Sequence, residues 1–521
     1  MFDPELPYAT TRAPVCARNL VASSQPLATQ AGMDALRRGG NAVDAALATA
    51  ITLTVVEPTS NGIGSDAFAQ IWDGTQLFAI NGSGRAPGGW TPAYFAGRER
   101  LPHLGWDAVT VPGAVSVWVA VSERFGRLPF EDLFTAAIEY AANGYPVGPV
   151  TAHNWRNDLP LYSDYPEFAR HFGSGPRAGE VVRLPAAART LREIAATRGA
   201  SFYRGDLARR IEAAAIAQGG ALRRADLEAH RADWVEPIAQ AYRGVSLHEI
   251  PPNGQGLAAQ IALGILAHRE PDARDSAATI HVHIEAMKLA LGAAYTHFAD
   301  PRAMRITPAE LLAPDSLARA AASIGPQAMS LPPRSLPMSH DTVCLATADA
   351  GGMMVSFIQS NFHGFGSGIV VPDTGIALQN RGAGFSLDPK HPNCVAPGKR
   401  PFHTIIPGFV TAGGAPRLAF GVMGGHMQAQ GHVQMVTRLF DYGQNPQAAS
   451  DAPRWRVESD FSVALEASFP TGVARELALR GHVIKIDPSP RGFGGAQLVL
   501  ATDDGYVGGS DHRKEGCAAG F

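Results

Sequence analysis

Residues 339–349 read SHDTVCLATAD, a polar cluster that runs into an alternating, strand-like segment. Ser339, His340 and Asp341 are the residue types of a hydrolase triad. A triad needs three side chains that converge from different parts of a fold, whereas consecutive residues of an extended chain point in different directions. Geometry therefore argues against a catalytic triad made of three consecutive residues. The stretch is either a turn that leads into a strand or a site that uses Thr342 itself.

Thr342 would become a nucleophile if the peptide bond before it were cut. A hydroxyl is weak until a base takes its proton, and a free α-amino group, with a pKa of about 7.7–8, is such a base. The β-branch of threonine also restricts its rotamers, so that Oγ can be aimed from the start of a strand. Asp-Thr before a strand is usually a turn, so the residue types by themselves favour the turn over the nucleophile. The residue types alone leave both interpretations open.

The composition predicts a cytoplasmic enzyme that recognises its ligand at one local site and not through an overall surface charge. The 521 residues are enough for a large core or two lobes, and 44 Lys+Arg against 47 Asp+Glu argue against a nucleic-acid or membrane partner. No secretory signal is recognisable, and the apolar stretch 45–56 is too short to cross a bilayer. A cytoplasmic protein is expected. The cysteines form no C-x-x-C pair and are expected to be thiols: Cys16, Cys344, Cys394 and Cys517.

The sequence offers candidates for two other kinds of site, a metal site and a phosphate-binding loop. On a helix His281 and Glu285 share a face while His283 points away, so at most two metal ligands would converge and a structural role is favoured. The glycine-containing stretches GIGSDA and GKRPFH each lack part of a phosphate-binding loop. We therefore expect no metal and no cofactor.

Periodicity predicts an α+β fold in which helices cover packed sheets. Helical patterns occupy 29–40 and 41–58, where Asn41 with Asp44 resembles a capping box. Residues 128–300 are mostly helical, with a strand-like break, and strands dominate after 342. Between them, about 301–341 is rich in Pro and Ser and is predicted to be a mobile connector.

Eleven motifs then occur in a recognisable order: VASSQPLATQAGMDALRRGGNAVDAALA (21–48), EPTSNGIGSDAF (57–68), VTVPGAVSVW (109–118), PPNGQG (251–256), EAMKLA (285–290), TVCLATADAGG (342–352), NFHGFGSGI (361–369), LQNRGAGFS (378–386), PGKRPFHTIIP (397–407), GVMGGH (421–426) and GGSDHRKEG (508–516). With them the chain resembles the gamma-glutamyltransferase family of N-terminal nucleophile hydrolases over nearly its whole length. Within that family it is similar to the oxamate amidohydrolase branch.

The resemblance implies a self-cleaving precursor. A large subunit of residues 1–341 and a small one of 342–521 would stay together as a heterodimer, and such units could pair further. The implied fold is a four-layer αββα sandwich with an added helical lobe. Thr342 would supply both the nucleophile and the amine base, first for cleavage after Asp341 and then for an acyl-enzyme made from a substrate amide.

The resemblance also assigns site residues. Gly424 and Gly425 match the oxyanion glycines of the family, where backbone N–H groups stabilise the tetrahedral intermediate. Asn361 matches a substrate-contacting asparagine, although the surrounding spacing differs by one residue on each side. His403 and Thr404 stand where the family has a Ser-Ser pair that contacts the donor substrate.

The departures from the family pattern bear on the substrate. Gly384 stands where gamma-glutamyl enzymes have the carboxylate that binds an α-ammonium, and Arg381 replaces a neighbouring glutamine. Arg85, two residues later than expected, is the candidate for the family's carboxylate clamp. An ammonium beside a guanidinium is costly, so these changes favour a substrate with a carboxylate and no ammonium. Oxamate, dicarboxylic monoamides and cephalosporin-type acyl groups all fit, with hydrolysis preferred to transpeptidation.

Two alternatives remain at this point. The first is a gamma-glutamyl hydrolase or transferase, acting on glutathione and gamma-glutamyl amides, that holds the ammonium with another acid such as Asp66. The second is an uncut, non-catalytic relative that only binds a ligand. Retention of Thr342 and of the double glycine argues against the second alternative.

Overall fold

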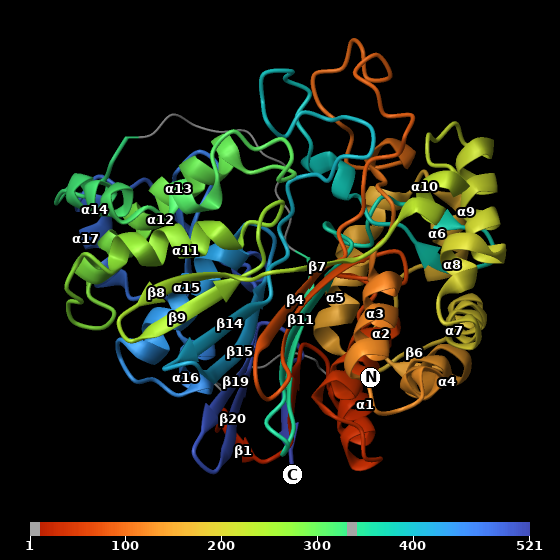
Figure 1. The fold of residues 1–521 in the computed structure, drawn as a ribbon, viewed down its shortest axis with the longest axis horizontal. Helices are drawn as coiled ribbons and strands as arrows, with labels where there is room; N and C mark the ends of the chain where they lie inside the picture. The colour runs from red at the N-terminus through yellow and green to blue at the C-terminus, as the bar shows by residue number, and fades with distance from the viewer. Residues whose placement is uncertain (1–10, 331–340) are drawn as a thin grey trace.

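Two large sheets packed face to face form the centre of the protein (Figure 1). The computed structural model describes residues 11–330 and 341–521. The first sheet has the strand order β1 (Val15–Ala17), β20 (Gly505–Ser510), β19 (Gly495–Thr502), β15 (Ala415–Met423), β14 (Gly408–Ala412), β9 (Val245–Glu249) and β8 (Ile238–Tyr242). The second has the order β21 (Cys517–Gly520), β2 (Leu20–Ser23), β10 (Val343–Ala348), β11 (Met354–Ser360), β3 (Asp66–Trp72), β4 (Leu77–Asn81) and β7 (Asp233–Val235).

Helices cover the outer face of each sheet, so the fold is a four-layer αββα sandwich with a helical lobe at one side, as expected (Figure 1). The second sheet and the lobe beside it carry α1 (Pro26–Arg37), α2 (Ala42–Val56), α3 (Ala114–Phe125), α4 (Thr135–Asn143), α5 (Pro149–Asp158), α6 (Pro166–Phe172), α7 (Pro185–Thr197), α8 (Ala200–Arg204), α9 (Asp206–Ala217) and α10 (Arg224–Ala229). The first sheet carries α11 (Gly256–Leu266), α12 (Ala277–His297), α13 (Pro308–Leu311), α14 (Pro314–Ser323), α15 (Met427–Phe440), α16 (Pro446–Asp451) and α17 (Thr471–Leu479).

Smaller elements complete the chain. Three minor sheets pair β5 (Tyr145–Pro146) with β6 (Val181–Val182), β12 (Val370–Val371) with β13 (Ile376–Ala377), and β16 (Trp455–Val457) with β17 (Val463–Glu466) and β18 (Ile484–Asp487). Short 3₁₀ turns are η1 (Trp106–Ala108), η2 (Phe130–Phe134), η3 (Leu159–Tyr162), η4 (Arg381–Gly384) and η5 (Pro490–Phe493). Two of them, η4 and η5, supply arginines to the site below. No helix in the described ranges is long and apolar enough to span a bilayer.

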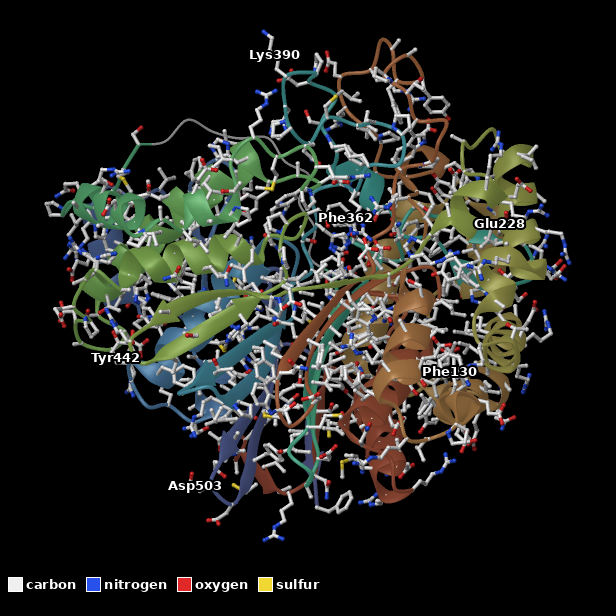
Figure 2. All side chains as sticks on the ribbon, in the orientation of Figure 1. Phe130, Glu228, Phe362, Lys390, Tyr442 and Asp503 are labelled. Carbon is white, nitrogen blue, oxygen red and sulfur yellow. The ribbon has the colours of Figure 1, made fainter. Side chains whose placement is uncertain are left out.

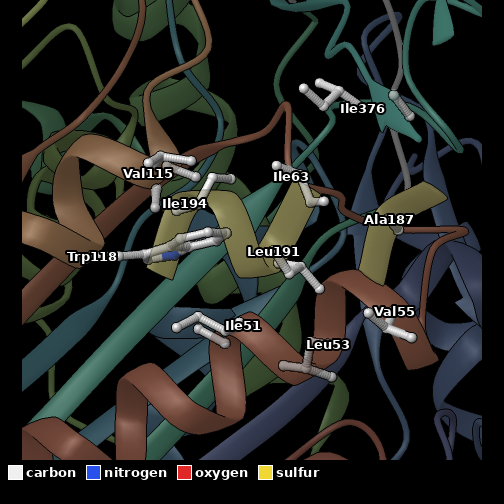
Figure 3. Close-up of a cluster of buried hydrophobic side chains, with 14 of the residues drawn as sticks. Ile51, Leu53, Val55, Ile63, Val115, Trp118, Ala187, Leu191, Ile194 and Ile376 are labelled. Atoms are coloured by element: carbon white, nitrogen blue, oxygen red, sulfur yellow. The ribbon is translucent and has the colours of Figure 1, made fainter. Parts of the chain in front are cut away.

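The helix α2 lies wholly inside the protein. Every one of its 15 residues is buried, because the helix lies between the second sheet and other helices, and its sequence is accordingly apolar on all sides. Figure 3 shows Ile51 and Leu53 of α2 beside Trp118 of α3 and Leu191 of α7 in this cluster. The predicted capping box is confirmed, with Asn41 at the N-cap.

The segment after Thr342 forms a central strand, β10. β10 begins one residue after Thr342 and pairs antiparallel with β11 on one side and β2 on the other. All its residues are buried, as is Thr342 itself. The strand prediction for this segment is confirmed, and it places Thr342 at the end of a strand in the middle of a sheet.

The predicted connector is in part wrong. Within 301–330 the chain forms α13 and α14, and Leu317 of α14 packs into the core beside α11. Pro308 and Pro314 each stand in the first turn of their helix, where a missing N–H costs nothing, so proline starts these helices rather than breaking them. Residues 331–340, the rest of the predicted connector before Asp341, lie outside the described residues.

Candidate active site

Thr342 is placed beside the bond that is predicted to be cut. Its Oγ1 lies 2.5 Å from the carbonyl oxygen of Asp341 and 3.1 Å from the Oγ of Ser360. Gln428 donates from Nε2 to the same hydroxyl at 3.3 Å. The Ser360 hydroxyl also donates to the Asp341 carbonyl oxygen at 3.1 Å. The hydroxyl and the carbonyl group of the Asp341–Thr342 bond are thus held together by neighbouring side chains.

Sequence reasoning missed Ser360 and Gln428. Ser360 ends β11, and since Val343 pairs with Gln359 in the antiparallel hairpin, Ser360 falls opposite Thr342. Counting back from the turn between the two strands could have found it. Gln428 lies in the first turn of α15, and its Oε1 accepts the N–H of Ile406 at 3.0 Å. No local pattern marks that glutamine.

Gly424 and Gly425 form the turn between β15 and α15. Their φ angles are +119° and +58°, a region that favours glycine, and a Cβ on Gly424 would lie 2.9 Å from the Cα of Gly494. Within the described part of the chain neither N–H donates a hydrogen bond. Gln255 donates to the carbonyl oxygens of Gly425 (2.8 Å) and Thr404 (2.6 Å), which fixes the turn. The geometry suits an oxyanion hole, and the role itself stays a prediction.

Arg381 is a fully buried guanidinium in η4. Its Nη1 donates to the Thr404 hydroxyl at 2.6 Å, and its guanidinium carbon lies 4.5 Å from the centre of the Phe362 ring. Nε and Nη2 have no hydrogen-bond partner among the residues that the structure describes. Burial lowers the pKa of Arg381 to about 9, so the group is still charged at neutral pH. A buried cation with two unused donors is an anion-binding arrangement.

Phe362 links this arginine to Thr342. Its backbone N–H donates to the Ser360 hydroxyl at 2.8 Å, and that hydroxyl is the one beside Thr342. Phe362 lies near the centre of the molecule in Figure 2, at the upper end of the central strands. Arg381 and Thr342 are therefore parts of one site.

Asp66 and His403 form a buried pair next to Arg381. The His403 Nε2 lies 3.0 Å from an Asp66 carboxylate oxygen, and since Nδ1 accepts the N–H of Ile405, the proton is assigned to Nε2. The other Asp66 oxygen accepts the N–H groups of Gly113 (3.1 Å) and Gly84 (3.2 Å). Burial raises the pKa of Asp66 to about 7, against the opposing charge of the neighbouring arginine. Burial likewise lowers the pKa of His403, which is neutral.

Asn361 and Gly384 complete the interior of the site. The Asn361 Oδ1 accepts the Ser65 hydroxyl at 2.8 Å, whereas its Nδ2 has no partner in the described ranges. A Cβ on Gly384 would lie 2.9 Å from the Phe402 carbonyl oxygen, so a larger side chain would require the chain to move. This close approach gives a physical reason why no carboxylate stands at position 384.

Arg85 lies further out than the sequence interpretation needs. It is half-buried and pairs with Asp233 (3.3 Å) and Asp300 (3.7 Å), and no contact with Thr404 or Arg381 is found for it among the described residues. Sequence reasoning did not single out Arg400, which is buried near Arg85 and donates to the Ser83 carbonyl oxygen and to Asp233. The positive charge of Arg400 acts to lower the pKa of both Asp66 and His403.

A second polar cluster lies on α12, away from these residues. The ring of His281 is 2.8 Å from His482, and Glu285 is close to both, a set that could ligate a metal. The ammonium of Lys288 lies 2.8 Å from Glu285 and 3.3 Å from His482, so a positive charge already balances the carboxylate. His283 takes no part in the set, as expected from its opposite helix face.

Comparison with known proteins agrees with the geometry. The profile of the gamma-glutamyltranspeptidase family matches residues 28–521. The chain belongs to the gamma-glutamyltranspeptidase family. Among its relatives are the glutathione hydrolase-like YwrD proenzyme of Bacillus subtilis (36% identical; 97% of this chain and 98% of the relative) and the oxamate amidohydrolase proenzyme of Klebsiella pneumoniae (36%; 97% and 99%).

A solved structure is also closely similar to this chain. The crystal structure of a cephalosporin acylase from Bacillus halodurans superposes with a TM-score of 0.96 at 47% identity, covering 100% of this chain and 99% of that one. The chain is thus a gamma-glutamyltranspeptidase family enzyme with the N-terminal nucleophile hydrolase fold. Two relatives at 36% identity are named for glutathione and oxamate chemistry, and the solved structure at 47% identity is named for cephalosporin chemistry. The family assignment therefore leaves the substrate to the residues of the site.

Proposed function

We propose that this chain cuts itself before Thr342 and then hydrolyses the amide of a small, carboxylate-bearing acid, of the oxamate kind, through an acyl-enzyme on Thr342. Self-cleavage is supported by the 2.5 Å contact between the Thr342 Oγ and the Asp341 carbonyl group and by relatives that are named as proenzymes. The substrate class rests on one observation, the buried guanidinium of Arg381 with two unused donors.

Self-cleavage begins at the hydroxyl of Thr342. Oγ attacks the carbonyl carbon of Asp341, its proton passes to the leaving nitrogen, and the C–N bond breaks to leave an ester. Breaking the C–N bond frees the amino group of Thr342, and water then hydrolyses the ester, which restores the hydroxyl and gives Asp341 an α-carboxylate. Ser360, within hydrogen-bond distance of both reacting groups, orients them.

Turnover repeats the chemistry on a substrate. The freed amine of Thr342 takes the proton of Oγ, and Oγ attacks the substrate amide. The negative oxygen of the tetrahedral intermediate is stabilised by the N–H groups of Gly424 and Gly425 at the N-terminal end of α15. The amine or ammonia leaves with the proton, and water releases the acid. Neither step requires a cofactor.

Arg381 selects the acid. A carboxylate that reaches its Nε and Nη2 gains two charge-assisted hydrogen bonds in a dry site, and the Asn361 Nδ2 offers a further donor. An α-ammonium would meet a guanidinium instead of an acid, because position 384 is glycine. The balance favours acids without an amino group.

The alternative, a gamma-glutamyl hydrolase or transferase, has one observation in its favour. Asp66 lies beside Arg381 and is the buried acid that could meet an ammonium. Both of its oxygens already accept hydrogen bonds, which counts against this use.

Side-by-side assays separate these functions. We expect release of ammonia from oxamate and little or none from glutamine, glutathione or a gamma-glutamyl anilide. Strong turnover of the gamma-glutamyl compounds would overturn the role given to Arg381. Denaturing electrophoresis tests the uncut alternative: a persistent single band near 54.9 kDa would mean a non-catalytic relative, whereas two fragments that are absent in Thr342→Ala support self-cleavage.

A further inference from the structure

The side chain of Asp341 is held by a binding arrangement of its own. Arg491, from η5, donates from Nε (3.0 Å) and Nη2 (2.9 Å) to the two oxygens of the carboxylate. The N–H of Gly364 adds a third hydrogen bond at 2.9 Å, and Asp341 is 1% exposed. The other edge of the Arg491 guanidinium binds Asp158, at the end of α5: Nη1 and Nη2 donate to the two carboxylate oxygens at 2.8 and 2.7 Å.

Gly364 is required at its position for this contact. Its φ is +52°, and a Cβ there would lie 2.6 Å from the Tyr162 hydroxyl and 3.2 Å from an Asp158 oxygen. Glycine allows the chain to turn its N–H toward the carboxylate without these clashes. Three donors from two segments therefore surround one carboxylate, and we call Arg491 Nε, Arg491 Nη2 and the Gly364 N–H the carboxylate notch.

The chemistry of self-cleavage indicates the length of the acyl group that the carboxylate notch can bind. In the ester that the Thr342 Oγ forms with Asp341, two carbons, Cα and Cβ, separate the ester carbonyl from the side-chain carboxylate. That is a substituted succinyl-enzyme. Its carboxylate is the group bound by the notch, so the site is built to hold a four-carbon acyl group on this hydroxyl.

We propose that the carboxylate notch is a substrate-binding site that Asp341 fills in the uncut chain, and that a four-carbon monoamide of the succinamate type fills it after cleavage. The inference rests on the proposed function and specifies its substrate class. Oxamate, whose carboxylate is attached directly to the amide carbonyl, ends two carbons short of the notch and would depend on Arg381 alone.

Charge explains how the site becomes available. Before cleavage two carboxylates, Asp158 and Asp341, share the single guanidinium of Arg491. Burial and the neighbouring Asp341 raise the pKa of Asp158, while the two carboxylates raise that of Arg491 above its ordinary value. Hydrolysis of the ester gives Asp341 an α-carboxylate, a third negative group beside one arginine, and the new amino group of Thr342 does not offset this charge when it is deprotonated to act as the base. The repulsion weakens the hold on Asp341, and Arg491 stays paired with Asp158.

The test uses full-length chains that cannot react. In Thr342→Ala we compare calorimetric binding of succinate before and after adding Asp341→Ala, which empties the notch. We expect succinate to bind about tenfold or more tightly once Asp341 is removed, because charge-assisted hydrogen bonds become available. Malonate, one carbon shorter, should gain less.

Removal of the notch should cancel this gain. Adding Arg491→Gln together with Asp158→Asn leaves no buried carboxylate unpaired, and melting temperature checks that the chain is folded. The matched control is Arg98→Gln, at a surface pair with Asp107. An equal affinity with and without Asp341, or a gain that survives loss of Arg491, would overturn the inference.

The outcome is separable from that of the proposed function. The binding is measured without Thr342 chemistry, so a succinate gain in a protein whose wild type hydrolyses no amide would sink only the proposed function. Turnover of oxamate by the wild type, with no succinate gain in the variants, would sink only the notch.

Discussion

Replacing Arg381 by glutamine should separate recognition of the acid from the chemistry. The substitution removes the buried charge and at least one of the two unused donors, Nε and Nη2. A hydrogen bond to a charged group contributes about 1.5–3 kcal/mol. Since 1.4 kcal/mol corresponds to a factor of ten, kcat/KM for a carboxylate-bearing amide should fall about 10- to 100-fold.

The assay is ammonia release from oxamate and from ethyl oxamate, its uncharged ester. Arg381→Gln should lower kcat/KM for the first and leave the second nearly unchanged. Arg85→Gln is the matched control, because Arg85 is partly exposed and pairs with Asp233 and Asp300, whereas no contact with Thr404 or Arg381 is found for it among the described residues. Equal losses for both substrates, or no loss for oxamate, would refute the carboxylate clamp. A larger loss from Arg85→Gln would move the clamp to the position expected from the family pattern.

Three further outcomes are expected. Ser360→Ala should slow self-cleavage, followed by electrophoresis, about tenfold or more, because the hydroxyl bonds the scissile carbonyl group; unchanged kinetics would remove Ser360 from the reaction. The pKa of Asp66, raised to about 7, means that its anion forms above that pH and competes for Arg381, so KM for oxamate should rise as pH increases through 7 and Asp66→Asn should flatten the rise. The two fragments should co-purify without denaturant and separate in it; fragments that part on gel filtration would contradict the interleaved sheets.

The same ionisation has a consequence for stability. An aspartate whose pKa is about 7 when folded, against 3.8 ordinarily, keeps its proton in the folded state while the unfolded chain loses it. Its contribution to stability is therefore full below about pH 4 and is lost as pH rises to 7. The sign is opposite to that of Asp511, whose pKa buried arginines lower.

Local rules recovered the local structure. The capping box at Asn41 and the strand after Thr342 were predicted because a few adjacent residues determine them. The connector was predicted from a composition rich in Pro and Ser, and composition does not show that Pro308 and Pro314 stand at helix starts. Strand order could not be read from periodicity, since β1 pairs with β20 and β2 with β21 across nearly the whole chain.

Some residues of the candidate site were predictable from sequence motifs, and others were not. The family motifs placed Thr342, Arg381 and Thr404, and the structure brings them into one cluster. Arg491 could not be predicted, because its partner Asp341 is 150 residues away and no motif surrounds it. Arg400 stood in a recognised motif, but its burial depends on Ser83 and Asp233 from distant segments. Chemistry at a junction of several segments needs the tertiary structure.

The topology makes the bond that we propose is cut dispensable to the fold. In the second sheet β10 and β11, which follow Thr342, lie between β2 and β3, which precede it, and the first sheet likewise places β14 and β15 beside β9. The large fragment alone would lack strands from the middle of both sheets. The small fragment alone would lack β2 from inside the second sheet and would lose strands from the ends of both sheets, so the hydrogen-bond ladders of either fragment would open. The fold therefore depends on both fragments but not on the bond between Asp341 and Thr342. A bond that the fold does not need can be hydrolysed without loss of structure, and its hydrolysis supplies the free amine that Thr342 requires in the proposed mechanism.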